Sequence, residues 1–332
     1  MPAAAQSRGI RPAQRPATSS GPLVSIVISN FNYAEFLAIA IDSALAQTYR
    51  EFEVIVVDDG STDHSAEVID RYADRVTAVF KPNGGQASAF NTGVEHSQGE
   101  LVCLLDADDV FEPDKVRRVV AAAIAHPEAH LIHHRMRMVD ESGCPMHAPF
   151  PRCLPHGDVR AESQRTGGWI LSSLSSALTF RRAYLDRVCP IPLHHSGRNP
   201  DGRALRVYPD TYLSMPAGLL APVAAVPAPL SLYRVHGDNA SRKIRRRGSD
   251  DPHLISQLAI HEAEVATARR LLHDVFDQQV SLTVEDHLGY QMARHAMGHI
   301  TTREIVGRVM KTSSLPFTVR VRETVCVLAG RR

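Results

Sequence analysis

The chain has 332 residues, of which 44% are hydrophobic and 22% charged, and its formal net charge at pH 7 is +1. These values allow one large domain with an extension, or two domains, and they give no electrostatic reason to expect a nucleic acid partner. The five cysteines are scattered and form no Cys-x-x-Cys motif, which indicates neither a disulfide framework nor a zinc knuckle. We therefore expect a reducing, cytoplasmic setting.

Predicted strands and helices alternate from residue 23 to about residue 133. Apolar runs predict strands at 23–29, 52–57, 76–80, 101–105 and 129–133, and helical spacing of apolar residues predicts helices at 36–45, 61–72, 87–96 and 113–125. This alternation predicts an α/β fold, with a mostly parallel sheet and helices on both of its faces. Neither a Gly-x-Gly-x-x-Gly after the first strand nor a Gly-x-x-x-x-Gly-Lys-Ser/Thr phosphate loop occurs.

The ends of the chain differ in character from this core. Residues 1–21 are rich in Ala, Pro, Ser and Gln and lack the apolar segment of a signal peptide, so we expect a disordered tail. No apolar run reaches membrane-spanning length. Residues 190–210 are rich in Pro and Gly and predict a substrate-side loop. Apolar residues beyond 253 recur on one helical stripe and predict a helical C-terminal extension over 253–332.

Three carboxylates follow the most apolar predicted strand. The run Leu101–Leu105 leads into Asp106, Asp108 and Asp109, and ligands of open α/β sheets bind at the carboxyl ends of strands. Acids crowded at such a point repel one another, and oxygen ligands suit Mg²⁺ or Mn²⁺ together with substrate phosphates. We interpret this segment as the centre of a metal and phosphate site, with a solvated acidic turn as the alternative.

Other polar residues fall at similar places. Asp58 and Asp59 end the second predicted strand, where a carboxylate can accept hydrogen bonds from a nucleobase or a ribose, although Asp59 also suits a helix cap. Asp210 precedes an apolar helix-like stretch and is a candidate base or another helix cap. His236 is a candidate ligand for metal or phosphate, or an ordinary structural histidine.

These motifs together resemble the family-2 glycosyltransferases with the GT-A fold. The resemblance is close over about residues 23–125, extends loosely to about 242, and rests on four motifs in the family's order: 24–32, 56–63, 83–86 with 91–93, and 99–109. It implies a GT-A domain at 22–240, with a nucleotide half at about 22–133 and an acceptor half at about 134–240. A basic linker at 241–252 and the helical extension would follow.

The resemblance also implies residue roles. Asp210 stands where the family places its catalytic base, although Pro209 precedes it where many members have Glu. Asp108 and His236 match the metal and diphosphate positions. The residues that would bind a nucleotide-sugar donor are Asn30, Asp58, Asp59, Asn83, Gly84, Gln86, Asn91 and Asp106.

The implied activity is the metal-dependent, inverting transfer of a sugar from a nucleotide sugar. A UDP-sugar is the preferred donor, and dTDP- and GDP-sugars are the alternatives. The acceptor would be a hydroxyl of a glycan or a lipid-linked molecule in cell-envelope synthesis. The basic run at 242–247 suggests peripheral contact with the inner face of the membrane, or simply a solvated linker.

Two other functions fit some of the same residues. Asp106-x-Asp108-x-Val110 also fits the signature of haloacid-dehalogenase-type phosphatases, but that motif normally follows the first strand of its domain, and here three predicted strands precede it. A non-catalytic scaffold that binds nucleotide sugars is the other alternative, because a fold alone does not fix a function.

Overall fold

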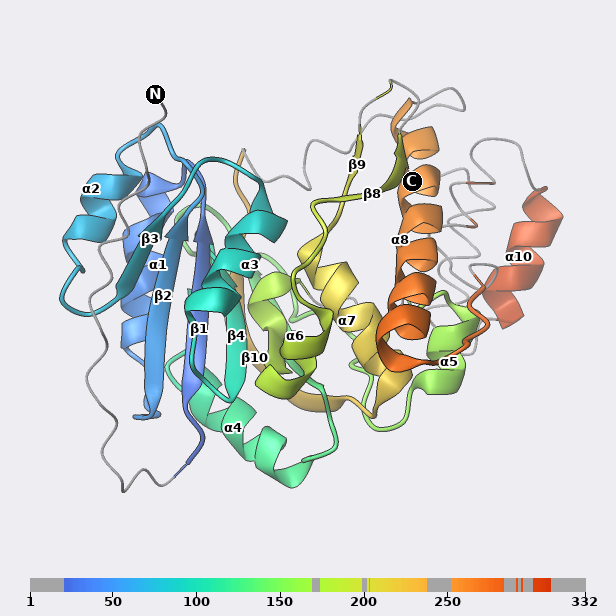
Figure 1. Cartoon of the computed structure of the whole chain (residues 1–332), viewed down its shortest axis with the longest axis horizontal. Helices are drawn as coiled ribbons and strands as arrows, with labels where there is room; N and C mark the ends of the chain where they lie inside the picture. Colours follow the sequence, from blue (N-terminus) through green and yellow to red (C-terminus); the bar gives the residue numbers. More distant parts are fainter. Residues whose placement is uncertain are drawn as a thin grey trace.

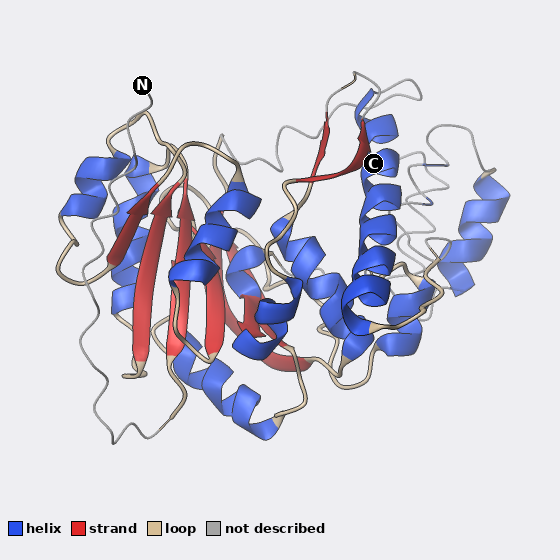
Figure 2. Ribbon diagram, viewed as in Figure 1, coloured by secondary structure: helices blue, strands red, loops and turns tan. Residues whose placement is uncertain are grey.

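A computed structural model of the chain describes residues 21–168, 174–198, 202, 204–237, 252–283, 291, 294 and 301–311. Residues 1–20 of the predicted N-terminal tail, Trp169 and the basic run at 242–247 lie outside these residues. Within them, a curved eight-stranded sheet runs through the molecule with helices packed on both sides (Figures 1 and 2). The strands, in their order across the sheet, are β3 (Thr77–Phe80), β2 (Phe52–Asp58), β1 (Val24–Asn30), β4 (Leu101–Asp106), β7 (Leu178–Arg181), β6 (Leu131–Val139), β10 (Ala224–Arg234) and β5 (Val110–Phe111).

The first four strands of this order are all parallel, as the alternating sequence predicts. Beyond β4 the sheet is mixed. β7 is antiparallel to both β4 and β6, β10 is parallel to β6, and β5 is antiparallel to β10. The predicted nucleotide half, residues 22–133, therefore has the parallel geometry that brings strand ends to one edge. The mixed strands of the predicted acceptor half extend the sheet beside it.

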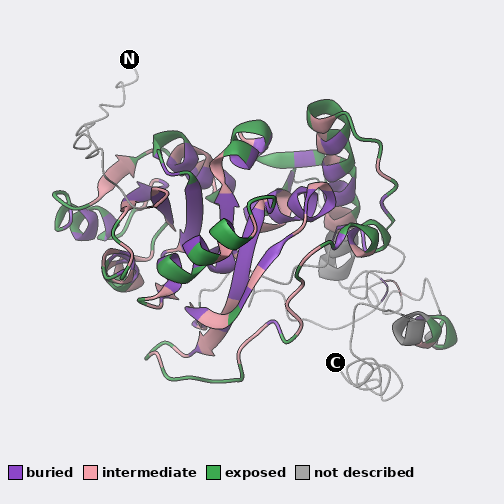
Figure 3. Ribbon diagram, turned by 90° about the horizontal axis from the view of Figure 1, so that it is seen from below, coloured by how far each residue is buried: buried purple, intermediate pink, exposed green. Residues whose placement is uncertain are grey.

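Two apolar cores cover the two faces of the sheet. Successive residues of a strand point to opposite faces, and in β1 Ile26 and Ile28 belong to one core whereas Val27 belongs to the other. The central strands of the sheet are buried while the outer faces of the helices are exposed (Figure 3). The first core involves α1 (Ala34–Leu45), α2 (Ser65–Asp70) and α4 (Lys115–Ala125), and the second involves α3 (Gln86–His96), α6 (Arg182–Val188) and α7 (Pro209–Leu220).

Several elements of the second half differ from the sequence-based expectation. The strand predicted at 129–133 begins at Leu131 and continues to Val139. Strand β7, which was not predicted, is followed directly by a helix that begins at Arg182, whereas the sequence shows a helix-like pattern from Phe180. Strand β10 was not predicted, since it contains Pro227 and Pro229. The register with β6 shifts at these prolines, which lack the N–H that a regular ladder needs.

The proline-rich stretch at 190–210 is not wholly a loop. It contains the two-stranded antiparallel sheet of β8 (His194–Arg198) and β9 (Ala204–Arg206). Residues 160–165 form the short helix α5 (Arg160–Arg165), and η1 (Ser175–Ala177) is a single 3₁₀ turn before β7.

The described C-terminal residues are largely helical, as predicted. They include α8 (Pro252–Phe276) and α10 (Thr302–Lys311), which lie at the end of the molecule farthest from β3 and α2 (Figure 1). Helix α8 packs against α7 and against the β8–β9 sheet. It is thus attached to the acceptor half of the predicted domain. Within the described ranges, no helix is both long and apolar enough to cross a membrane.

Candidate active site

The parallel register gathers several predicted site residues at one edge of the sheet. Asn30 at the end of β1 pairs with Asp58 at the end of β2, and Ser29 pairs with Asp106 at the end of β4. This edge is formed by the carboxyl ends of the strands, where α/β folds bind ligands.

Asn30 and Asp58 hold each other and the loop that follows β2. The Asn30 amide Nδ2 donates to Asp58 Oδ1 at 2.8 Å and to Ser61 Oγ at 3.2 Å, and the Ser61 N–H donates to Asp58 Oδ2 at 3.0 Å. Both side chains are buried, and Asn30 Oδ1 has no hydrogen-bond partner among the described residues. A carboxylate keeps spare lone pairs after two such bonds, so Asp58 can still accept a hydrogen bond from a ligand.

Asp59 organises the loop after β3. Its carboxylate accepts hydrogen bonds from the backbone N–H of Gly84 at 3.0 Å and of Gly85 at 2.6 Å, and it pairs with the Lys81 ammonium. The side chain is buried. Asp59 therefore fixes the Gly-Gly turn that carries Asn83, whose side chain is exposed at the same edge.

Gly60 allows these two loops to approach each other. Its φ is +75°, and a Cβ at this position would lie 2.7 Å from the backbone nitrogen of Asn83. Any larger residue would meet both the left-handed backbone and a steric clash. The sequence Asp-Asp-Gly is thus required by the contact between the loops after β2 and β3.

Asp106 ends β4, beside the first strand of the predicted acceptor half, β7. Its Oδ1 accepts a hydrogen bond from Gln86 Nε2 at 2.7 Å, and its backbone N–H donates to Ser176 Oγ at 3.0 Å. Burial, followed by the nearby carboxylates of Asp108 and Asp210, raises the pKa of Asp106 to about 8. A divalent cation at this point would counter that repulsion and favour the ionised form.

Asp108 and His236 meet although they are 128 residues apart in the sequence. His236 Nε2 lies 3.0 Å from Asp108 Oδ2, and both side chains are buried. The His236 ring packs against Tyr33 and Phe36 at the start of α1, with ring centroids 5.4 Å and 4.8 Å away. These aromatic contacts fix the orientation of the imidazole.

Asp109 and Arg234 support this pair. Asp109 Oδ1 accepts the backbone N–H of Arg234 at 3.1 Å, and Arg234 Nε donates to the Asp108 carbonyl oxygen at 3.1 Å. Asp109 Oδ2 is buried without a hydrogen-bond partner among the described residues. Burial and the charges of Asp108 and Asp106 raise the pKa of Asp109 well above its usual range.

The Asp108–His236 pair fits two positions of a metal site. Adjacent ligands of an octahedral ion with bonds of about 2.1 Å lie about 3 Å apart, which matches the 3.0 Å between the two side chains. Within the described ranges, no group of three or more His, Cys, Asp or Glu side chains forms a complete site. The two residues would therefore need further ligands, and Mg²⁺ or Mn²⁺ commonly takes them from water and phosphate.

Asp210 is placed next to these acids by the first turn of α7. Its Oδ1 accepts the backbone N–H of Thr211 at 2.8 Å, and burial raises its pKa. Its charge raises the pKa of Asp106, so the two carboxylates share one region of the site. The position follows from Pro209, which opens the helix with a preset φ.

Asn91 lies in a different setting. Its Nδ2 donates to the Ile191 carbonyl oxygen at 2.8 Å and its Oδ1 accepts the Ile191 N–H at 2.7 Å. Both polar ends of the amide thus join α3 to the chain before β8. This differs from the predicted role as a donor contact.

Sequence reasoning overlooked two residues that shape the site. The hydroxyl of Ser176 accepts a hydrogen bond from the backbone N–H of Asp106. This residue was not predicted, because a serine in a Leu-Ser-Ser-Ala run has no distinctive sequence pattern. From the sequence, Arg234 could be a phosphate contact or, more often, a surface residue; in the structure it is buried and donates a hydrogen bond to the Asp108 carbonyl oxygen. Its place directly before Val235-His236 was the available clue.

Comparison with known proteins identifies the class. The profile described as Glycosyl transferase family 2 matches residues 25–188. A Nostoc sp. protein named as an uncharacterized glycosyltransferase is 33% identical over 226 residues, which are 65% of this chain and 66% of that protein. The chain thus belongs to glycosyltransferase family 2, as the sequence motifs predicted.

Solved structures confirm the fold. The S. aureus TarS fragment 1–349 in complex with UDP-GlcNAc has a TM-score of 0.52 and 15% identity, and the match covers 93% of this chain and 92% of that one. The mannosyltransferase PcManGT from Pyrobaculum calidifontis, in complex with GDP-Man and Mn²⁺, has a TM-score of 0.52 and 16% identity, covering 95% and 82%. The α/β architecture is therefore that of the GT-A glycosyltransferases.

Proposed function

We propose that the protein is a metal-dependent, inverting glycosyltransferase that moves a sugar from a nucleotide sugar to an acceptor hydroxyl. The observation that carries this proposal is the meeting of Asp106, Asp108 and Asp210 at the carboxyl edge of the sheet, on segments up to about a hundred residues apart in the chain. Membership of the family supports it independently.

The loops after β1, β2 and β3 would bind the nucleoside. Asp58 and Asn30 offer hydrogen-bonding groups at the strand ends, and Asp59 holds Asn83 and Gly84 beside them. Gln86 would reach the donor together with Asp106, to which it is already bonded. Asn91 would contribute to this side by positioning α3, since its own amide is bonded to Ile191.

Asp108 and His236 would hold Mg²⁺ or Mn²⁺ against the diphosphate. Such a cation stabilises, as a Lewis acid, the negative charge that the leaving nucleoside diphosphate gains. Asp108 would bring the carboxylate, and His236 the imidazole that Tyr33 and Phe36 keep in orientation.

Asp210 would act as the general base. Its carboxylate takes the proton of the acceptor hydroxyl while the acceptor oxygen forms a bond to the anomeric carbon. The bond from that carbon to the phosphate oxygen breaks, and its electron pair leaves with the diphosphate. One displacement from the face opposite the leaving group inverts the anomeric configuration. The contact with the Thr211 N–H keeps Asp210 oriented for this attack.

The donor and acceptor are proposed by chemical class. A UDP-sugar is the first choice, and the named complexes of two similar folds, with UDP-GlcNAc and with GDP-Man, set the range to be tested. The acceptor would be a glycan or a lipid-linked molecule used in cell-envelope synthesis, with the enzyme in the cytoplasm or at the inner face of the membrane.

The test is turnover of nucleotide sugars by the whole chain. Release of nucleoside diphosphate from UDP-GlcNAc and from GDP-Man would be followed with Mn²⁺ and with EDTA, using water or added sugars as acceptor, for wild type and Asp210→Asn. The proposal expects release that needs metal, loss of at least a hundredfold in Asp210→Asn, and a product of inverted configuration by NMR. Binding without release would support the scaffold, and phosphate release from monoesters would support the phosphatase.

A further inference from the structure

Glu264 is a buried carboxylate on the C-terminal helix α8 that faces the acceptor half of the site. Its side chain is 4% exposed, and neither Oε1 nor Oε2 has a hydrogen-bond partner among the described residues. His261 on the same helix places its Nδ1 3.6 Å from Oε2, which is longer than a hydrogen bond. This carboxylate has lost its contact with water and has gained no hydrogen bond from the described residues in return, which costs free energy.

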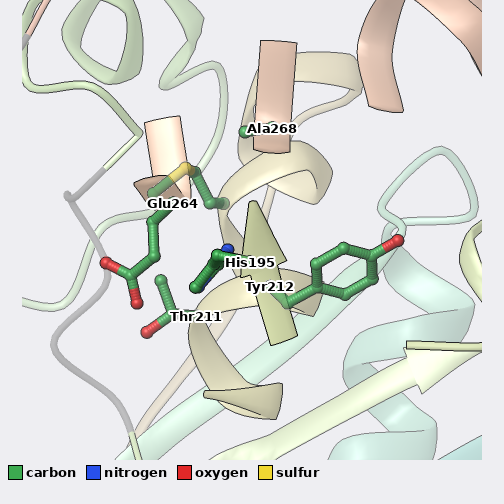
Figure 4. Close-up of a pocket in the computed structure, with 6 residues that line it drawn as sticks. His195, Thr211, Tyr212, Glu264 and Ala268 are labelled. Atoms are coloured by element: carbon green, nitrogen blue, oxygen red, sulfur yellow. The ribbon is translucent and has the colours of Figure 1, made fainter. Parts of the chain in front are cut away.

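A small cavity connects Glu264 to the helix that carries Asp210. The volume open to the centre of a water molecule is ≈ 10 Å³, about the space that one water needs. Figure 4 shows the Glu264 carboxylate and the Thr211 hydroxyl on the same side of the cavity, with the Tyr212 hydroxyl turned away. The lining residues are His195, Thr211, Tyr212, Met215, Glu264 and Ala268.

The groups that face Glu264 leave it without a strong positive partner. His195 on β8 is bonded to Thr267 through Nδ1, and burial with the charge of Arg270 lowers its pKa to about 4, so it is neutral near pH 7. Tyr208 and Asp210, at the start of α7, both interact electrostatically with Glu264. The strongest charged neighbour on α7 is thus another acid.

We propose that Glu264 is a positioning residue for Asp210, and that helix α8 therefore belongs to the catalytic unit. The inference rests on the proposed function, in which Asp210 is the base. Two carboxylates that share one region of low polarity keep one proton between them, and the more buried member holds it more strongly. By surface area Glu264 is buried whereas Asp210 is half-buried, which favours the shared proton on Glu264 and an ionised Asp210.

The ionisation of Glu264 then adjusts the strength of the base. Burial and, to a smaller degree, the Asp210 carboxylate raise the pKa of Glu264 to about 7, and His261 opposes this rise. Above that pH a second negative charge stands behind Asp210. It strengthens Asp210 as a base and favours the positive charge that develops on the transferred sugar. Transfer should therefore accelerate as Glu264 loses its proton.

The first test needs no substrate. Infrared difference spectra of the whole chain should show a protonated carboxyl component that is lost around pH 7 in wild type and is missing in Glu264→Gln, beside the separate signals of Asp106 and Asp109, whose pKa values are also raised. In Asp210→Asn the midpoint should fall, because the neighbouring negative charge is gone. Glu262→Gln, which changes an exposed acid of the same helix, should leave the band as in wild type. A midpoint that Asp210→Asn does not move overturns the inference.

The second test separates this inference from the proposed function. Between pH 6.5 and 8.5, kcat for nucleoside diphosphate release should rise roughly two- to fivefold in wild type and in Glu262→Gln. It should stay flat in Glu264→Gln, with the KM for the donor unchanged. A Glu264→Gln protein that keeps the wild-type rise contradicts the positioning role. An active Asp210→Asn protein instead contradicts the assignment of the base, whatever Glu264→Gln does.

Discussion

Asp108 Oδ2 lies 3.0 Å from His236 Nε2, which joins the loop after β4 to the segment after β10. The two strands are not neighbours in the sheet, since β7 and β6 lie between them. The contact therefore depends on the curvature of the sheet, on the buried Arg234 and on the aromatic residues of α1 that hold the imidazole.

His236→Gln should weaken metal binding without unfolding the protein. The substitution keeps a polar side chain but removes the imidazole nitrogen, so the apparent Kd for Mn²⁺ in the presence of nucleotide should rise about tenfold. Electron paramagnetic resonance of free Mn²⁺ measures this directly. His64→Gln, at an exposed position before α2, is the matched control and should bind like wild type. Equal affinities for both variants would remove His236 from the metal site.

Asn91→Ala should lower stability and leave nucleotide affinity unchanged. The substitution removes both hydrogen bonds to Ile191, and leaving such backbone groups unpaired costs about 1–3 kcal/mol of unfolding free energy. Urea denaturation and calorimetric nucleotide binding measure the two quantities. Asn83→Ala, in the exposed loop after β3, should keep the stability of wild type and bind nucleotide more weakly. An Asn91→Ala protein of normal stability with weakened binding would instead favour the donor contact predicted from the sequence.

Gly60→Ala should displace the donor-side loops. A Cβ 2.7 Å from Asn83 N cannot be accommodated without movement, and the left-handed φ alone costs an L-residue about 1–2 kcal/mol. Gly143→Ala provides the control, because Gly143 has a φ of +86° with nothing within 4 Å of the added Cβ. Gly60→Ala should lose more stability than Gly143→Ala and bind nucleotide at least tenfold more weakly. Equal losses in the two variants would show that the clash is relieved.

Glu264 should make stability depend on pH between about 4.5 and 7. Its pKa is raised from the ordinary 4.5 to about 7 in the folded chain, so the folded state binds more protons than the unfolded state in this interval. Stability therefore falls as pH rises, and the loss is complete above pH 7, where it amounts to about 3 kcal/mol at most.

Glu264→Gln removes this titration. Its unfolding free energy should equal that of wild type near pH 4.5 and exceed it increasingly up to pH 7 or above. Denaturant unfolding at a series of pH values measures the difference, and Glu262→Gln should follow wild type throughout. A difference between Glu264→Gln and wild type that does not change with pH would mean that Glu264 titrates normally.

The nucleotide half could be predicted from the sequence because its signals are local. Leu101–Leu105 is an unbroken apolar run, which is typical of a strand that is covered on both faces of a sheet, and the acidic residues follow it directly in the chain. Asp58 and Asp59 could be predicted as site residues for a similar reason. They lie at the end of a strand, and the carboxyl ends of parallel strands lie at the same edge of the sheet. Hydrophobic periodicity and chain order therefore sufficed for this half of the fold.

The acceptor half could not be predicted in the same way because its geometry depends on contacts distant in sequence. The prolines of β10 argue against a strand, and only pairing with β6, with two shifts of register, makes one. Pro216 likewise lies inside α7, where tertiary packing overrides its low helix propensity. The amide of Asn91 has the residue type of a ligand contact, but its partner, 100 residues away, is not visible in any local pattern.

We propose that the acidic end of β4 is a site for nucleotide and metal. The most direct measurement is the melting temperature of wild type and Asp108→Ala with UDP, GDP or dTDP, each with and without Mn²⁺. A ligand at a hundred times its Kd adds about 2.7 kcal/mol of stability. We expect one nucleotide to raise the melting temperature of wild type by several degrees only with Mn²⁺, and Asp108→Ala to lose this shift. No shift in wild type, or the same metal-independent shift in both proteins, would contradict it.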